Sequence, residues 1–400
     1  MEIIKSQNPK TTNQSKTQTN SKRVLYVKKN SYFALIKIMP KIFLLNEFQH
    51  IKLKKLFRQC LDVKRKFYPT SRILKLTEHT KSITAVCFST CGKFFATASL
   101  DGHVIIYEID PLNQLRHGDI YYKVSISVPI SSICYSKIKN YFAIITLNGS
   151  LSVYNFNSLD RENFGTKLFQ LEQFCRSYSI HFSADSELIA SANDSGRIKI
   201  IGTNPDKIDS FGKEIINKVY HEGAVLSVKF SNYSSNNYIA SGGQDGITKL
   251  ISYNESHQIN KFREIIFKFT DSGSIWSVSF SPNDHFLATG SSSNRVCVYG
   301  VNELDKVNYG KLIIKLSGHT WSVSSVAFSA CSNLLATGSE DRSINIYNIY
   351  YRSEKIQFKT DKYMKKLTRS HNKAITCIDF SPNGYYFGSG SVDTTCAVYI

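Results

Sequence analysis

The sequence predicts an all-β protein built from seven copies of one antiparallel unit, and two periodic features support this prediction. An aromatic residue followed by Ser recurs seven times, at intervals of 47 to 52 residues. A tight-turn position follows each copy, and an apolar residue lies six residues after it. Repeats of this length are typical of proteins that array one small structural unit. The aromatic residues are Phe88, Tyr135, Phe182, Phe230, Phe280, Phe328 and Phe380.

Each copy contains three strand signals in the same order. An alternating apolar run precedes the aromatic residue, as in Val323–Phe328, and a small-residue strand such as Ala336–Ser339 follows it. The turn comes next, for example Asp101-Gly102, where Gly, Asn and Asp tolerate a positive φ. A third alternating strand completes the copy, and short strands between turn signals predict an antiparallel architecture. The third strands end at Tyr107, Tyr154, Ile201, Ile251, Tyr299, Tyr347 and Tyr399.

Composition excludes several other classes. Hydrophobic residues make up 42% and charged residues 20% of the 400 residues, which is typical of a globular protein and not of a fibrous or wholly disordered one. We expect no spanning helix, because uncharged apolar runs of about 18 residues are absent. The nine cysteines are odd in number and irregularly spaced, which favours reduced thiols over a disulfide framework or zinc site. The polar N-terminus lacks a signal core, so we do not expect secretion.

The repeated residues resemble the WD-repeat β-propellers. The clearest copy combines Gly318-His319 with residues 335–341 and residues 344–348. The resemblance covers about residues 71–400 and implies a seven-bladed antiparallel β-propeller. The Trp that gives the family its name is absent from all seven third-strand ends, where Tyr or Ile stands instead. We expect Tyr or Ile to fill the same space between blades.

The N-terminal side of the repeats is predicted to close the ring. The chain given ends at Ile400, just after the third strand of the seventh repeat. Lys75-Leu76-Thr77 is similar to Lys315-Leu316-Ser317, which ends a fourth strand. We therefore expect residues 71–77 to complete the seventh blade. Closure removes exposed strand edges, which otherwise promote aggregation.

The family links a His before the first strand to an Asp in the tight turn by hydrogen bonds within one blade. Four repeats have both residues, 22 or 24 positions apart, and the other three have neither. This joint loss fits a paired interaction, because an unpartnered buried carboxylate is strongly destabilising. We expect these residues to be structural, and we predict no catalytic residue, metal site or cofactor. The pairs are His79 with Asp101, His221 with Asp245, His319 with Asp341, and His371 with Asp393.

A candidate partner-binding surface follows from the same resemblance. In WD-repeat proteins, residues three and five positions after the His position face the usual partner surface. Repeats three to five have Arg176, Tyr178, Leu226 and Trp276 at such positions. Trp, Tyr and Arg are enriched at interface hot spots, so these four residues are the predicted partner-binding site. The alternative is that the aromatic rings only cover the blade tops, and Trp321 is a weaker candidate.

Residues 1–70 are predicted to form a basic N-terminal arm. Sixteen Lys and Arg residues against three acids give residues 1–68 a charge of +13, out of a net charge of +19. Residues 1–31 have a composition typical of disorder, and residues 46–67 show helical spacing of apolar residues. RNA, anionic lipid or an acidic protein could bind such a helix, and a solvated charged helix is the alternative. Met39 is an alternative start of the chain.

Taken together, these features predict a non-catalytic scaffold or adaptor that binds protein partners through the top face of the propeller. We expect a monomer within a larger complex, located in the cytoplasm, with the nucleus as the alternative. Two other functions are consistent with the sequence: an RNA-associated assembly factor that uses the basic arm, and a substrate receptor of a ubiquitin ligase. The sequence does not identify the partner or the pathway.

Overall fold

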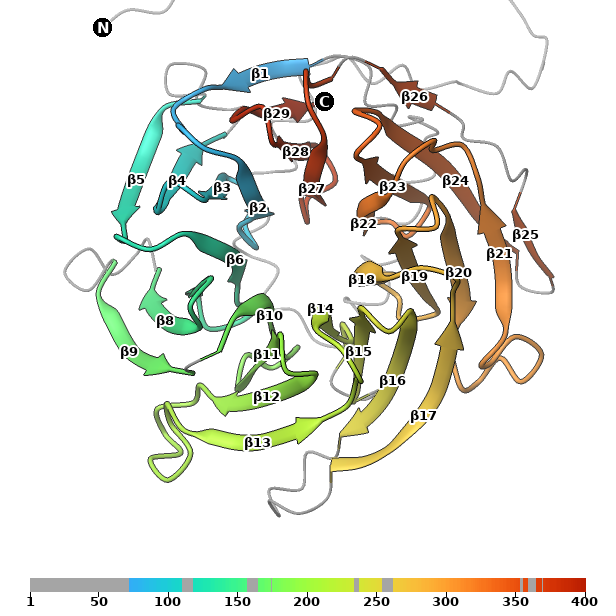
Figure 1. The fold of residues 1–400 in the computed structure, drawn as a ribbon, viewed down its shortest axis with the longest axis horizontal. Helices are drawn as coiled ribbons and strands as arrows, with labels where there is room; N and C mark the ends of the chain where they lie inside the picture. Colours follow the sequence, from blue (N-terminus) through green and yellow to red (C-terminus); the bar gives the residue numbers. More distant parts are fainter. Residues whose placement is uncertain are drawn as a thin grey trace, which may run out of the picture. The chain divides into compact units, whose positions relative to one another are not determined.

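The computed structural model forms seven antiparallel sheets arranged around a common centre (Figure 1). Each sheet is one blade of a β-propeller, numbered here by the order of its innermost strand along the chain. The predicted all-β, seven-bladed architecture is therefore confirmed. The structure describes residues 72–109, 118–156, 165–173, 175–233, 237–253, 262–352, 355–358, 365–368 and 370–400.

The two inner strands of each blade carry the periodic residues of the sequence. The innermost strand ends at the aromatic residue, and the second is the small-residue strand. The innermost strands are β2 (Ile83–Phe88), β6 (Ile130–Tyr135), β10 (Ser177–Phe182), β14 (Val225–Phe230), β18 (Ile275–Phe280), β22 (Val323–Phe328) and β27 (Ile375–Phe380). The second strands are β3 (Phe94–Ser99), β7 (Tyr141–Thr146), β11 (Leu188–Asn193), β15 (Tyr238–Gly243), β19 (Phe286–Ser291), β23 (Leu334–Ser339) and β28 (Phe387–Ser391).

The third and fourth strands complete each blade toward the outside. The third strands are β4 (His103–Glu108), β8 (Ser150–Asn155), β12 (Arg197–Gly202), β16 (Ile247–Tyr253), β20 (Val296–Gly300), β24 (Ile344–Arg352) and β29 (Cys396–Tyr399). The outer strands of blades one to five are β5 (Ile120–Ser125), β9 (Lys167–Glu172), β13 (Glu214–Val219), β17 (Phe262–Thr270) and β21 (Leu312–Leu316). In blade six, β25 (Lys355–Phe358) and β26 (Lys365–Leu367) both pair with β24.

Blade seven takes its outer strand from the N-terminal side of the described residues. β1 (Arg72–Leu76) pairs antiparallel with β29, with Leu74 opposite Val398 and Leu76 opposite Cys396. Figure 1 shows β1 beside β29 at the outside of the last blade. The first described strand and the last strand of the chain thus belong to one sheet.

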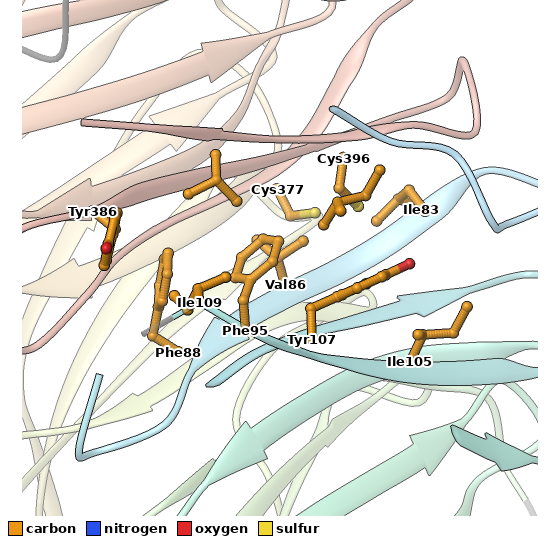
Figure 2. Close-up of a cluster of buried hydrophobic side chains, with 12 residues drawn as sticks. Ile83, Val86, Phe88, Phe95, Ile105, Tyr107, Ile109, Cys377, Tyr386 and Cys396 are labelled. Carbon is orange, nitrogen blue, oxygen red and sulfur yellow. The ribbon is translucent and has the colours of Figure 1, made fainter. Parts of the chain in front are cut away.

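The hydrophobic core consists of clusters between neighbouring blades. The cluster between blades seven and one combines Phe88 and Phe95 with Cys377 and Cys396 (Figure 2). Six further clusters lie at the other blade interfaces. The seven Tyr or Ile residues that end the third strands are all buried, as expected for the residues that replace Trp.

Hydrogen bonds also join the innermost strands of successive blades. A Ser hydroxyl in each of blades two to six accepts the backbone N–H of a residue in the next blade, at 3.1–3.4 Å. Between blades seven and one, the Asp379 carboxylate accepts the Phe88 N–H at 3.0 Å. His181 Nδ1 accepts the Phe230 N–H at 3.1 Å in the same way. The Ser residues are Ser132, Ser179, Ser227, Ser277 and Ser325.

Every blade also has a left-handed residue directly after its tight-turn position. Gly occupies this position in blades one to four, where a positive φ involves no Cβ clash. Blades five to seven have Asn294, Arg342 and Thr394 there, with φ values of 64°, 68° and 71°. The left-handed conformation is unfavourable for a residue with a Cβ, and above all for a β-branched one.

The predicted basic arm, with its helix at about residues 46–67, lies outside the described residues. No helix is present in the part of the chain that the structure describes. That part accordingly contains no helix that could cross a membrane.

We expect deletion of residues 71–77 to destabilise the whole ring, because it removes β1 from β29 and exposes the cluster between blades seven and one. The measurement is the melting temperature of the deletion variant, with a deletion of residues 1–60 as the control. Equal melting temperatures for the two variants would contradict a closing role for β1.

Replacing Thr394 by Gly is expected to stabilise the protein by about 1 kcal/mol, since it removes a β-branched side chain from a left-handed position. Chemical denaturation measures the change in the free energy of unfolding. G246T is the reverse control and should destabilise, because a Cβ at Gly246 would lie 2.9 Å from the Asp271 carbonyl oxygen. An unchanged or lower stability of T394G argues against strain at this turn.

The D379N variant tests the burial of the Asp379 carboxylate between blades seven and one. Burial raises the pKa of Asp379 to about 6, although the Phe88 N–H and the charge of Lys229 lower it. Since this folded-state pKa lies above the unfolded value, the stabilising contribution of the carboxyl is lost as the pH rises through about 6. Asn still accepts the N–H without a charge, so D379N should gain about 2 kcal/mol over the wild type between pH 4 and pH 7.

Unfolding curves at several pH values measure this difference, with D206N, at an exposed carboxylate, as the control. A constant difference between D379N and the wild type across this pH range is the contrary result.

Candidate interaction surface

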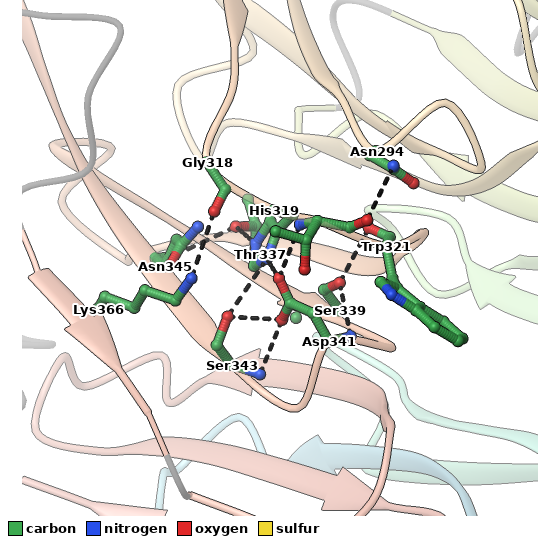
Figure 3. Close-up of polar contacts among 12 residues, drawn as sticks. Asn294, Gly318, His319, Trp321, Thr337, Ser339, Asp341, Ser343, Asn345 and Lys366 are labelled. Carbon is green, nitrogen blue, oxygen red and sulfur yellow. Dashed lines mark hydrogen bonds and ion pairs between the residues drawn. The ribbon is translucent and has the colours of Figure 1, made fainter.

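The predicted His and Asp residues lie within hydrogen-bonding distance at the tight-turn end of four blades. His Nδ1 faces the Asp carboxylate at 2.9 Å in blades one and six, 3.0 Å in blade four and 3.3 Å in blade seven. Figure 3 shows Asp341 between His319 and Ser343. The Asp341 carboxylate also accepts the Thr320 N–H at 3.0 Å and the Ser343 N–H at 2.9 Å. One carboxylate thereby joins the loop before the first strand to the tight turn.

A hydroxyl residue completes each network, and the sequence reasoning missed it. The second His nitrogen, Nε2, lies 2.7–2.9 Å from a hydroxyl oxygen of the second strand. The available signal was a Ser or Thr four positions before each turn Asp. These residues are Thr97, Ser241, Thr337 and Ser389.

Blades three and five contain different polar contacts at the same place. In blade three, Gln173 stands at the His position and accepts a hydrogen bond from Ser191 at 2.9 Å. In blade five the carboxylate is at the His position and not in the turn. Asp271 stands there and accepts a hydrogen bond from the turn residue Ser293 at 2.8 Å. The joint loss of His and Asp therefore does not leave the residue at the His position of these two blades without a polar contact.

In each of the four networks, both ring nitrogens of the His have a hydrogen-bond partner. Burial lowers the pKa of His79 and His221 despite the adjacent carboxylates, which favours the neutral ring. Burial also raises the pKa of Asp341, but donors from His319 and Ser343 outweigh it and hold that pKa well below its ordinary value. Each pair belongs to its own blade, and no three or more His, Cys, Asp or Glu residues gather into a metal-binding group among the described residues.

The position five residues after each His position is a β-bulge. In all seven blades the register between the first two strands shifts around this one residue. A bulge leaves a residue unpaired and redirects its side chain. The bulge residues are Thr84, Ser131, Tyr178, Leu226, Trp276, Ser324 and Thr376.

The bulge residues fall into two groups. In blades one, two, six and seven they carry hydroxyl groups that donate to backbone carbonyls of the second strand. Two of them also reach the next blade, since Thr84 donates to the Ile130 carbonyl at 2.8 Å and Ser324 to the Ile375 carbonyl. Blades three to five instead have Tyr178, Leu226 and Trp276. The small hydroxyl residues therefore form hydrogen bonds within and between blades. The three large residues lie on adjacent blades.

We call Arg176, Tyr178, Leu226 and Trp276 the blade 3–5 rim. Their innermost strands β10, β14 and β18 follow one another around the centre (Figure 1). Trp276 is 42% exposed, Arg176 is also exposed, and Tyr178 and Leu226 are half-buried. Trp321 is 63% exposed but lies outside this run of blades, before the innermost strand of blade six. The four predicted residues therefore lie on three adjacent blades.

A pocket of about 390 Å³ adjoins the rim at Arg176. It lies between the loops of blades two and three. Sequence reasoning did not find it, because its walls come from separate repeats. Its lining residues are Val128, Pro129, Leu147, Asn148, Cys175 and Arg176.

Comparison with known proteins shows a short similarity to one characterised complex component. The chain is 40% identical over 63 residues to the "Set1 complex component swd1" of Schizosaccharomyces pombe. The matched segment spans 16% of this chain and 14% of the relative.

The family comparison covers more of the chain. The family described as "WD domain, G-beta repeat" matches residues 70–108, 213–252, 263–300, 310–348 and 362–399. Each match contains the outer strand of one blade and the three inner strands of the next. The matches leave out the inner strands of blades two and three, which also lack the His and Asp pair. These five matches and the seven-bladed ring show that the chain belongs to the WD-repeat β-propeller family.

Proposed function

We propose that the protein is a non-catalytic scaffold that binds a protein partner through the blade 3–5 rim. The observation that carries the proposal is the division of the bulge residues. Four blades use this position for hydrogen bonds within the ring, and three adjacent blades have large side chains there. Trp276 is 42% exposed and belongs to a run of large side chains on adjacent blades, and a contiguous exposed apolar patch is typical of an interaction site.

The composition of the rim supports a protein partner. Tyr and Trp bury large areas at little cost in conformational entropy, and Arg adds directional hydrogen bonds. Leu226 lies on the blade between those of Tyr178 and Trp276, so an apolar segment of a partner could contact all three residues. The rigid ring beneath the rim holds these side chains in place before binding.

We further propose that the protein acts as one subunit of a multiprotein assembly. Its family provides protein-interaction scaffolds, and the relative in Schizosaccharomyces pombe is by name a component of a complex. We expect a single copy of this chain in the assembly. The cytoplasm, with the nucleus as the alternative, stays the predicted location.

An RNA-associated assembly factor is the second candidate function. The charge of +13 on residues 1–68 favours it, because Lys and Arg neutralise phosphates and release counterions. These residues lie outside the described part of the chain. The third function considered above, substrate receptor of a ubiquitin ligase, gains no support from the described residues.

The W276A variant tests the proposed function in a quantitative pull-down from the source cells, read by mass spectrometry. If the rim is a hot spot, the variant should retain roughly 30-fold less partner than the wild type, since truncating such a residue costs about 2 kcal/mol or more. W321A is the matched control, because it removes an equally large and more exposed ring outside the rim.

Nuclease treatment and deletion of residues 1–68 separate the two candidate functions. Partners that survive both treatments but are lost with W276A support the rim. Partners that vanish with nuclease or with the arm, and persist in W276A, contradict the rim and favour the RNA-associated function.

A further inference from the structure

The pocket beside the blade 3–5 rim is lined by both apolar and polar side chains. Val128, Pro129 and Leu147 supply aliphatic surface, while Asn148 and Arg176 supply nitrogen donors. Asn148 and Arg176 are exposed, and the other lining residues are half-buried. A ligand group in this pocket would therefore meet both hydrocarbon and N–H groups.

The two polar side chains have donors available for a ligand. Asn148 uses its Oδ1 within its own turn, where it accepts bonds from the Thr146 hydroxyl at 2.5 Å and the Ser150 N–H at 3.4 Å. Its Nδ2 has no hydrogen-bond partner in the described structure. The Arg176 guanidinium likewise forms no ion pair with any described residue. Both side chains can thus donate to an incoming acceptor.

The charge around the pocket favours an anion. Its lining contains one cation and no carboxylate. The Asp194 N–H donates to the Arg176 carbonyl at 2.9 Å, but Asp194 is not part of the lining. The lining of this partly apolar pocket therefore carries one positive charge and no negative charge.

We propose that this pocket binds a Glu or Asp side chain of the partner segment that crosses the blade 3–5 rim. The planar fork of Arg matches a carboxylate with two parallel hydrogen bonds. The aliphatic walls match the methylene groups that carry such a carboxylate. A phosphate group would normally require a cluster of Arg residues, and the pocket has one. The proposal rests on the proposed function, because it assigns one contact to the partner of the rim.

A peptide selection tests the proposal with the full chain. Random twelve-residue peptides displayed on phage are selected in parallel against the wild type, R176Q, W276A and R197Q. R197Q is the matched control: it removes the same charge from the same blade, at a side chain that bonds Asn217 and does not line the pocket. The wild type and R197Q should enrich peptides with Glu or Asp beside apolar residues, and R176Q should lose the acidic preference.

Binding constants then test the contact itself. A fluorescein-labelled peptide from the selection and its Glu-to-Gln or Asp-to-Asn counterpart are titrated against the wild type and R176Q. Each single change should weaken binding roughly tenfold, as expected for a hydrogen bond to a charged group. The double change should add little to either one, because both remove the same contact.

The outcomes distinguish this proposal from the proposed function. Peptides that require Trp276 but show no acidic preference overturn the pocket assignment and leave the rim intact. Peptides that bind W276A as well as the wild type contradict the rim itself. A selection in which R176Q enriches the same acidic peptides, or in which the wild type enriches none, also overturns the pocket assignment.

Discussion

The burial of both faces of every blade is the constraint on which this structure depends. The seven hydrophobic clusters lie between blades, so each sheet needs a neighbour on both sides. A linear stack would leave two faces exposed, and a closed ring leaves none. The hydrogen bonds from one innermost strand to the next reinforce the same interfaces near the centre. The interface between blades seven and one then joins segments from opposite ends of the repeat sequence.

This constraint separates residues that support the ring from residues that are free to vary. The residue just after the bulge is Ser in five blades, because its hydroxyl accepts an N–H of the next blade. The bulge residue is less constrained, since its backbone is unpaired. Hydroxyl residues there add bonds to the ring, and Tyr178, Leu226 and Trp276 do without them. Function can therefore change at the bulges without loss of the fold.

The fold could be predicted from the sequence because the residues that recur in every repeat are also the residues that are buried between the blades. The aromatic-Ser pairs and the third-strand Tyr or Ile residues occupy the same places in every blade. The hydroxyl partners of His79, His221, His319 and His371 were missed, since Ser and Thr are common throughout these strands. Asp271 shows a further limit of the sequence. An acid at the His position indicates that the His and Asp pair is lost, yet Asp271 forms a polar contact with the turn.

The pocket beside Arg176 could not be predicted from any single repeat. Its walls come from the turn of blade two and the loops before the first strands of blades two and three, and only the ring brings these segments together. The same argument explains where specificity can arise in a repeat protein. A surface made of seven identical copies would offer seven equivalent sites. Departures from the repeat make one part of such a surface distinct, and here they lie in the blade that carries both Arg176 and Tyr178, and in the two blades that follow it.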